Sequence, residues 1–256
     1  MWPACLPGKG DTTLSESEHL DVLAFAPHPD DLELCCGGTL IRLADGGNRV
    51  GLVDLTRGER GTRGTPELRQ VEAEAARRIL GARQRTNLGF PDQGIDARNA
   101  IQLRRVVETI RRHRPRLVLT SSEHDHHPDH VEAAHLVEKA AYLAGLAGFE
   151  ADGAPFRPGL TLFYMGRVVF EPKLIVDISE AFDRRVRAAA CYQSQFFREA
   201  DDPRVTPISE PGFFDDVAAR LRHFGNRIGV RYGEPFDARE PFGVTDVGAL
   251  VPGGTP

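Results

Sequence analysis

The chain has 256 residues, of which 41% are hydrophobic and 27% are charged, and its formal net charge is -5. The length fits one large α/β domain or two small ones, and the composition is typical of a soluble globular protein. The negative charge argues against a general nucleic-acid-binding protein, which would normally contain a basic domain.

The first 19 residues are polar and contain Pro and Gly. They include no apolar stretch that resembles a signal peptide or a membrane span. We therefore expect residues 1–19 to be a disordered extension and residues 20–256 to form a single domain with no membrane partner. The four cysteines form no CxxC pair and show no disulfide spacing, which predicts reduced thiols and a cytoplasmic protein.

From residue 20 onward, strand-like apolar runs alternate with helix-like runs. We predict strands at residues 21–26, 49–56, 85–90, 116–122, 160–166 and 173–179. We predict helices at residues 32–47, 68–82, 99–115 and 130–148, and at about 180–197 and 213–228. The alternation, with strands rich in Val, Ile and Leu, predicts an α/β, Rossmann-like fold: a mostly parallel sheet with helices on both faces.

Two histidine-rich stretches directly follow two of the predicted strands. "PHPDD" (27–31) follows the first strand, and "EHDHHPDH" (123–130) follows "RLVLTSS" (116–122). In open α/β sheets, ligands bind beyond the carboxyl ends of the strands. We therefore expect the two stretches to share one rim of the sheet and to form a functional site.

The residue types in these stretches suit a metal ion. Histidine is the commonest metal ligand, and His28, Asp31 and His130 offer two imidazoles and one carboxylate for zinc. Adjacent side chains diverge, so Asp30 is expected to face the open metal position and to act as a general base. Two alternatives remain open: Asp31 could instead cap the following helix, and "HDHHPDH" could be a solvated loop.

Not every histidine or cysteine can belong to the site. We expect His124 and His126 to lie on the surface, whereas His127 and His130 compete for roles in the site. Cys35 and Cys36 are expected to be buried small hydrophobic residues. His113 and His223 are expected to face solvent.

Four arginines, Arg57, Arg60, Arg63 and Arg69, follow the second predicted strand on the same rim. Arg60 and Arg63 are expected to belong to a solvated Gly-Arg loop. Arg69 could pair with a carboxylate in a bidentate geometry, which suits an anionic substrate. The acidic net charge and the lack of interleaved aromatics argue against RNA binding, and no GxGxxG follows the first strand.

"AFAPHPDDLELCCGGTL" followed by "HHPDH" resembles the LmbE-like family of zinc-dependent N-deacetylases, which includes the N-acetylglucosaminyl-phosphatidylinositol de-N-acetylases. The resemblance runs from about residue 20 to about residue 236. "NLGFPDQGI", "VDISEAFDRRVRAAACYQSQF" and "RYGEPF" are similar to the subgroup that deacetylates N-acetylglucosaminyl-malate in bacillithiol synthesis. The departures are small: Pro27 replaces the usual Ala, and Cys35–Cys36 replace a Gly-containing pair.

The resemblance implies a role for each matching residue. His28, Asp31 and His130 would be the zinc ligands, and Asp30 would be the base. His127 would stabilise the oxyanion or protonate the leaving amine, and Asp129 would orient a histidine. The residues expected to contact substrate are Arg57, Arg69 and Tyr232, although Tyr232 could equally be a packing residue.

The resemblance therefore implies a homo-oligomeric enzyme that hydrolyses the acetamide of N-acetylglucosaminyl-malate with Zn²⁺. An inositol glycoside or chitobiose remains an alternative substrate. Two other classes stay open. One is a non-haem Fe(II) oxygenase, because two histidines and one carboxylate also form the iron facial triad. The other is a non-catalytic sugar-binding module that has kept the fold.

Overall fold

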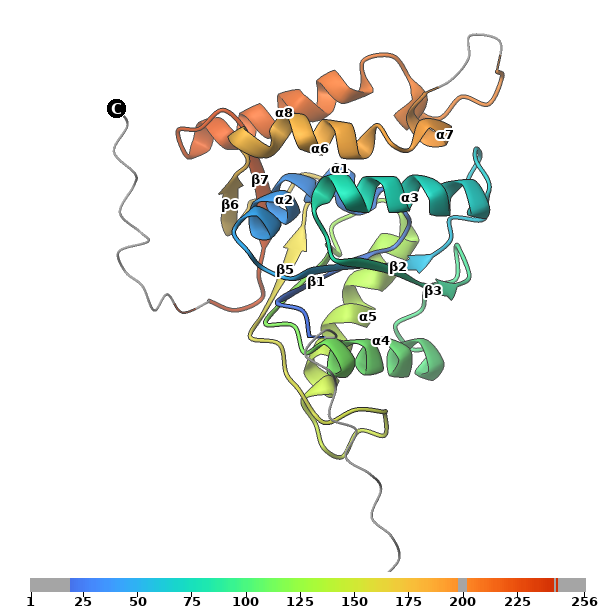
Figure 1. Cartoon of the computed structure of the whole chain (residues 1–256), viewed down its shortest axis with the longest axis vertical. Helices are drawn as coiled ribbons and strands as arrows, with labels where there is room; N and C mark the ends of the chain where they lie inside the picture. Colours follow the sequence, from blue (N-terminus) through green and yellow to red (C-terminus); the bar gives the residue numbers. More distant parts are fainter. Residues whose placement is uncertain (1–18, 198–201, 242, 244–256) are drawn as a thin grey trace, which may run out of the picture.

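The computed structural model describes residues 19–197, 202–241 and 243 (Figure 1). Within these residues, seven strands form one sheet in the order β3-β2-β1-β4-β5-β7-β6. Strands β1 to β5 run parallel to one another, whereas β7 is antiparallel to both β5 and β6. The strands are β1 (Val22–Ala26), β2 (Val50–Thr56), β3 (Gln84–Phe90), β4 (Leu117–Ser121), β5 (Leu160–Tyr164), β6 (Leu174–Asp177) and β7 (Gly233–Asp237).

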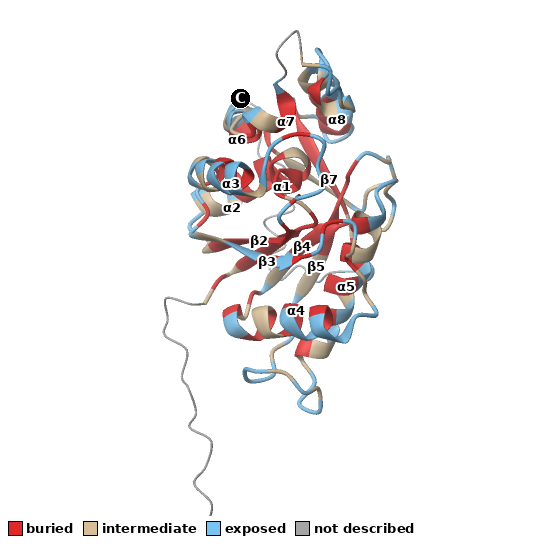
Figure 2. Cartoon of the chain, turned by 90° about the vertical axis from the view of Figure 1, so that its right-hand side faces the viewer, coloured by how far each residue is buried: buried red, intermediate tan, exposed pale blue. Residues whose placement is uncertain are grey.

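Helices cover both faces of the sheet, which confirms the predicted α/β class (Figures 1 and 2). Helices α4 and α5 lie on one face; α1, α2 and α3 lie on the other, with α6 and α8 beyond them. The helices are α1 (Asp31–Cys35), α2 (Gly37–Asp45), α3 (Pro66–Leu80), α4 (Ala100–His113), α5 (Pro128–Ala144), α6 (Phe182–Ala189), α7 (Gln193–Phe196) and α8 (Phe213–Arg227), with short 3-10 turns at Ser179–Ala181 and Pro207–Ser209. None of the helices in this described part combines the length and the apolar character needed to cross a bilayer.

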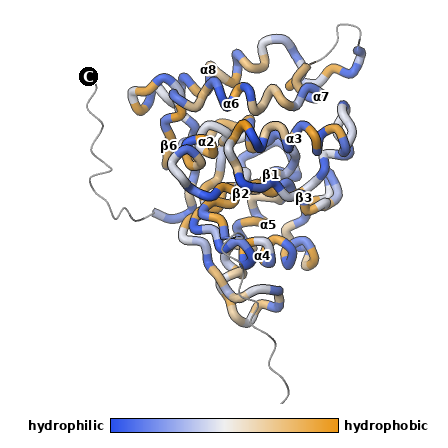
Figure 3. Tube along the Cα trace, in the orientation of Figure 1, coloured by the Kyte–Doolittle hydropathy of each residue, from blue (hydrophilic) through white to orange (hydrophobic). Residues whose placement is uncertain are grey.

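The central strands are apolar along their whole length because both of their faces are covered. Every residue of β1 and β2 is buried. Val22 and Ala24 belong to the core on the side of α2, whereas Leu23 and Phe25 belong to the core on the side of α4 and α5. Hydrophobic residues accordingly follow the centre of the sheet in Figure 3.

The helix predicted at residues 32–47 is divided at Cys36, whose backbone has φ -143° and ψ 17°. The second part, α2, begins at Gly37, and its Gly38 and Thr39 N–H groups donate to the carboxylate of Glu234 at 2.9 and 2.7 Å. Glu234 is fully buried. A carboxylate at a helix N-terminus satisfies N–H groups that a helix leaves free, so the break provides donors for this buried acid.

Strand β7 was not predicted, because Gly233 and Pro235 are typical of turns. Pro235 pairs with Ile175 of β6, and β5 pairs only with Phe236 and Asp237. The proline therefore lies where the strand has a single neighbour, a position that tolerates a missing N–H.

Three further expectations differ from the structure or lie outside it. The predicted helix at 180–197 is divided into a 3-10 turn, α6 and α7. His113, expected to face solvent, is only 7% exposed, and its Nε2 lies 3.2 Å from Nε2 of Gln84. By contrast, the expected burial of Cys35 and Cys36 is confirmed. Residues 1–18 of the expected N-terminal extension lie outside the described residues.

Candidate active site

The two histidine-rich stretches meet at one rim of the sheet. Strands β1 and β4 are parallel neighbours, with Val22 opposite Leu117, so the segments that follow them leave the sheet side by side. The ring centroid of His28 lies 4.8 Å from that of His127 and 5.5 Å from that of His130. The predicted convergence of these two segments is confirmed.

The carboxylate of Asp31 lies between two of these imidazoles. Its Oδ2 is 3.3 Å from Nδ1 of His28 and 3.3 Å from Nε2 of His130. The three side chains are between 10% and 13% exposed. Zinc binds N and O atoms at about 2.0–2.1 Å in tetrahedral sites, which places ligand atoms about 3.3 Å apart. The donor set and the two distances to Asp31 are compatible with the predicted metal site.

Asp31 does not act as the N-cap of the first helix. It is the first helical residue of α1, whereas Asp30 occupies the cap position. The Oδ2 atom of Asp31 turns back and accepts a hydrogen bond from the N–H of His28 at 2.9 Å. The carboxylate is thus held toward the histidines and not along the helix axis.

The histidines are held from behind by a second set of carboxylates. Nε2 of His28 lies 3.3 Å from both Asp92 Oδ1 and Asp129 Oδ2, and Nδ1 of His130 lies 3.1 Å from Asp125 Oδ2. A hydrogen-bonded carboxylate fixes the orientation and tautomer of a metal-binding imidazole. Asp129 makes such a bond to His28, whereas Asp125 and His130 are in ion-pair distance without hydrogen-bond geometry. The predicted orienting role of Asp129 is compatible with these contacts.

Sequence reasoning assigned no role to Asp92 or Asp125. Asp92 follows β3 in "FPDQG", at the same rim, and Asp125 lies in "EHDHHPDH". Their positions after parallel strands were the available signal, but acidic residues in turns are common. Among the described residues, two groups have ligand atoms that all lie within 4.8 Å of one another: His28, His127 and His130, and His28, Asp92 and Asp129. The predicted set of His28, Asp31 and His130 is not one of them.

The acids give this centre a field that favours positive charge. Burial acts to lower the pKa of His130, but Asp31 and Asp125 outweigh it and raise the pKa to about 10. For His28, hydrogen bonds to Asp129, Asp31 and Asp92 likewise overcome burial and raise the pKa well above its usual value. The same field would favour a bound metal cation.

Asp30 adopts an unusual backbone conformation. Its φ of 114° lies in the left-handed region, which costs a residue other than glycine about 1–3 kcal/mol. The side chain makes no capping hydrogen bond to α1. Instead, Oδ2 accepts a hydrogen bond from Nη2 of Arg69 at 2.9 Å. Burial raises the pKa of Asp30 to about 7, against the opposing charge of Arg69. A buried carboxylate of this kind suits the predicted general base.

His127 is the exposed member of the group. It precedes α5 as its N-cap residue, and its Nδ1 accepts the N–H of Asp129 at 3.2 Å. A neutral ring bonded in this way carries its proton on Nε2. Burial and the charges of His28 and His130 lower the pKa of His127. His124 and His126 are exposed, as predicted.

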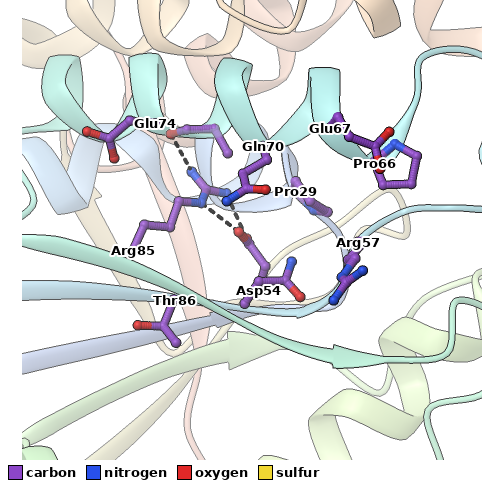
Figure 4. A pocket seen from close by; sticks show the side chains of 11 residues that line it. Pro29, Asp54, Arg57, Pro66, Glu67, Gln70, Glu74, Arg85 and Thr86 are labelled. Carbon is purple, nitrogen blue, oxygen red and sulfur yellow. Dashed lines mark hydrogen bonds and ion pairs between the residues drawn. The ribbon is translucent and has the colours of Figure 1, made fainter.

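The arginines differ from one another. Arg57 is exposed and lines a cavity of about 590 Å³ between α3 and strands β2 and β3, together with Pro29 (Figure 4). The floor of this cavity includes Asp54, which accepts two hydrogen bonds from Arg85 at 2.7 Å each. Arg60 is exposed as expected.

The expectation for Arg63 needs correction, and the contacts of Tyr232 bear on its two alternatives. Arg63 is not a solvated loop residue: it is 8% exposed and donates a hydrogen bond to the carbonyl oxygen of Phe197. Tyr232 is 3% exposed, and its ring stacks on that of Phe182 with a centroid distance of 3.7 Å. Of the two readings of Tyr232, packing is the one that its contacts support.

Comparisons with known proteins identify related sequences and structures. The profile of the family described as PIG-L: GlcNAc-PI de-N-acetylase matches residues 23–141, a range that includes every site residue from His28 to His130. Diacetylchitobiose deacetylase from Thermococcus kodakarensis is 31% identical over 227 residues, which cover 83% of this chain and 80% of that protein.

A probable N-acetyl-alpha-D-glucosaminyl L-malate deacetylase 2 from Bacillus cereus is 27% identical over 189 residues, covering 68% of this chain and 83% of that protein. Among solved structures, the conserved protein TT1542 from Thermus thermophilus is 42% identical, with a TM-score of 0.81. The match covers 89% of this chain and 98% of that one. The two sequence relatives are thus named as deacetylases, and TT1542 shares the fold of this chain.

Proposed function

The chain belongs to the PIG-L family of deacetylases, and we propose that it hydrolyses the acetamide of N-acetylglucosaminyl-malate with a zinc ion bound by His28, Asp31 and His130. Family membership itself supports hydrolytic deacetylation of N-acetylglucosamine conjugates. It favours hydrolysis over an iron oxygenase and over a non-catalytic binding module. The metal, the role of each residue and the malate group are the proposed part.

The observation that carries the proposal is the position of Asp31 between two imidazoles, with the carboxylate of Asp30 next to it in the chain. Asp31 Oδ2 is 3.3 Å from a nitrogen of each ring. When bound, a zinc ion polarises a carbonyl group and lowers the pKa of water. Asp30 would then accept the proton of the attacking water, as a general base within the same site.

The remaining residues complete the reaction. His127 carries a proton on Nε2, which it can donate to the oxyanion or to the leaving amine. Asp129 and Asp125 hold the rings of His28 and His130 in place. The amide C–N bond breaks, and the products are acetate and a free glucosaminyl amine.

The malate group is proposed from one relative and from local charge. The Bacillus cereus protein is named as a deacetylase of the malate conjugate, whereas the Thermococcus kodakarensis protein is named for chitobiose. Arg57 is an exposed cation that lines the same cavity as Pro29, the residue before Asp30. An exposed guanidinium suits a carboxylate such as malate better than it suits a neutral sugar.

The test is a mass-spectrometric screen for acetate release by the zinc-loaded protein. The substrates are the malate, inositol and chitobiose conjugates of N-acetylglucosamine. The malate conjugate is expected to react fastest, and preference for either of the other two would contradict the malate assignment.

A second measurement tests the base. Asp30→Ala is expected to lower kcat about 10²–10⁴-fold with bound zinc unchanged. Asp45→Ala is the matched control, because Asp45 is a carboxylate on the surface with a side chain 57% exposed. Normal turnover by Asp30→Ala would remove Asp30 from the mechanism.

A further inference from the structure

The buried arginine of the rim, Arg69, contacts the proposed base Asp30. We propose that Arg69 is a positioning residue, which holds the carboxylate of Asp30, and that the glycine-rich loop at residues 57–64 is shaped to admit its guanidinium. This inference rests on the proposed role of Asp30 as the base.

Arg69 contacts both the side chain of Asp30 and the backbone next to it. The arginine lies on α3 and is 4% exposed. Its Nη2 donates to Asp30 Oδ2 at 2.9 Å and also to the carbonyl oxygen of Pro29. A single nitrogen thus connects the carboxylate to the peptide that precedes it. Movement of the guanidinium would release both groups together.

Asp30 combines an unfavourable backbone conformation with a side chain that helix α1 does not bind. Its φ of 114° is unfavourable for a residue with a Cβ, and its side chain makes no cap bond to α1. Among the hydrogen bonds of the described residues, Arg69 provides the one side-chain donor to this carboxylate. Arg69 therefore offsets part of the strain at Asp30 and sets the direction of its carboxylate.

The loop "RGERGTRG" closes around the guanidinium. Gly58 has φ +64°, and a Cβ added there would overlap Nη1 of Arg69 and lie 2.7 Å from its Cζ. A Cβ at Gly61 would lie 3.4 Å from the same Nη1. Nη1 also lies 3.5 Å from the carbonyl oxygen of Gly58. A side chain at residue 58 would occupy the space of the guanidinium, so the glycine is required there.

Two hydrogen bonds tie this loop to the segment that carries the site. The N–H of Gly58 donates to Thr56 Oγ1 at 3.2 Å, and that hydroxyl donates to the carbonyl oxygen of Pro27 at 2.9 Å. The far end of the loop is fixed by Gln195, whose Nε2 donates to the carbonyl oxygen of Arg63 at 2.8 Å. The loop, the guanidinium and residues 27–30 are thus one connected unit.

The acceptors of Nη2 support a positioning role for Arg69. Both N–H groups of Nη2 already have acceptors, in Pro29 and Asp30. The Nε atom of Arg69 is buried without a hydrogen-bond partner among the described residues. A substrate carboxylate would reach Nη2 only by displacing Asp30, whereas Nη1 has a single acceptor in the part of the chain that the structure describes, the carbonyl oxygen of Gly58 at 3.5 Å.

Steady-state kinetics of Arg69→Lys and Gly58→Ala separate the two roles. Lysine keeps the charge but lacks the fork of donors. Both variants are expected to lose about 10²-fold in kcat, the scale of a catalytic group misplaced by about 1 Å, with KM unchanged within about twofold. A rise in KM with kcat unchanged would place Arg69 on the substrate and overturn the proposal.

The matched control is Gly47→Ala. Gly47 has φ +85°, but a Cβ there would meet nothing within 4 Å. It therefore carries the same kind of backbone cost as Gly58→Ala without contact to Arg69, and both kinetic constants are expected to stay as in the wild type. Millimolar guanidinium is expected to restore kcat to Arg69→Gly, and failure of this rescue across the accessible range would count against the proposal.

A readout independent of turnover separates this inference from the proposed function. In a crystal structure of Arg69→Lys, Asp30 is expected to leave the left-handed region or to turn its carboxylate away from its present position. An unchanged Asp30 would overturn the inference, even in a protein that deacetylates its substrate. Absence of acetate release from the wild-type protein would instead refute the proposed function, and the crystallographic comparison would still decide the role of Arg69.

Discussion

Removing the guanidinium of Arg185 should destabilise the protein severely, because it leaves a charge in the core. Arg185 is 1% exposed, and its Nε donates to Glu234 Oε1 at 3.0 Å. Glu234 is fully buried and receives two further hydrogen bonds, from the N–H groups of Gly38 and Thr39. In Arg185→Met the carboxylate would keep these two donors but lose its only charged partner among the described residues.

The magnitude follows from the burial of both partners. Breaking a buried pair by removing one partner costs about 3–5 kcal/mol. A domain has a total stability of about 5–15 kcal/mol, so the loss takes roughly a fifth of it or more. For a chain of this size, the melting temperature is expected to fall by roughly 6–20 °C.

Urea unfolding followed by circular dichroism measures the free energy of unfolding of each variant. The control is Arg184→Met, a neighbour on the same helix whose pair with Asp45 is exposed, with side chains 32% and 57% exposed. That variant is expected to change the free energy by about 0–1 kcal/mol. The double variant Arg185→Met/Glu234→Gln is expected to lose less than Arg185→Met alone, because no charge stays unpaired. A loss below about 1 kcal/mol in Arg185→Met would refute the reasoning, since it would fall in the range of surface pairs.

Three further predictions concern the metal and helix α4. Chelation is expected to abolish acetate release, and added zinc is expected to restore it. Emission spectroscopy measures whether all metal has been removed. Activity in fully metal-free protein would contradict the metal site. Asp129→Asn is expected to lower metal affinity about 10–100-fold, measured by competition with a chromophoric chelator. The control Asp96→Asn, at an exposed carboxylate, is expected to leave metal affinity unchanged. Equal affinities in the two variants would remove Asp129 from the site. Asn99→Ala removes the acceptor for the N–H groups of Ile101 and Gln102 at the start of α4. The free energy of unfolding in urea is expected to fall by about 1 kcal/mol, with kcat unchanged. A fall in kcat would count against a purely structural role.

The sequence predicts those parts of the fold whose signals are local. Strands β1 and β2 are recognisable because both of their faces are buried, and the end of α3 because Gly81 follows it with φ +78°. Strand β7 carries the opposite local signals, Gly233 and Pro235, and forms through pairing with β6. The break before α2 depends on Glu234, which is 196 residues from Gly38 in the chain. No inspection of residues 32–47 alone could locate it.

The residues of the candidate site could likewise be predicted only in part from the sequence. His28 and His130 could be brought together from the sequence because the strands that precede them were both predicted, and a parallel sheet places their ends at one rim. Asp92 could not be assigned, since an acid after a short strand is common. The contacts of Arg69 were also not predicted from the sequence. Its capacity for bidentate hydrogen bonds suggested a substrate carboxylate, whereas in the structure Nη2 donates to Asp30 and to the carbonyl oxygen of Pro29.

The contact between Glu234 and α2 has a consequence for biosynthesis. Residues 28–130, which include every proposed metal-binding group, would be synthesised long before Glu234, whose carboxylate binds the N-terminus of α2. Until then, two amide donors beside α1 lack their acceptor, and Arg185 lacks its counter-ion. A nascent chain that stalls before β7 would therefore carry all of the candidate zinc ligands without the support that its last strand gives to the helices next to them.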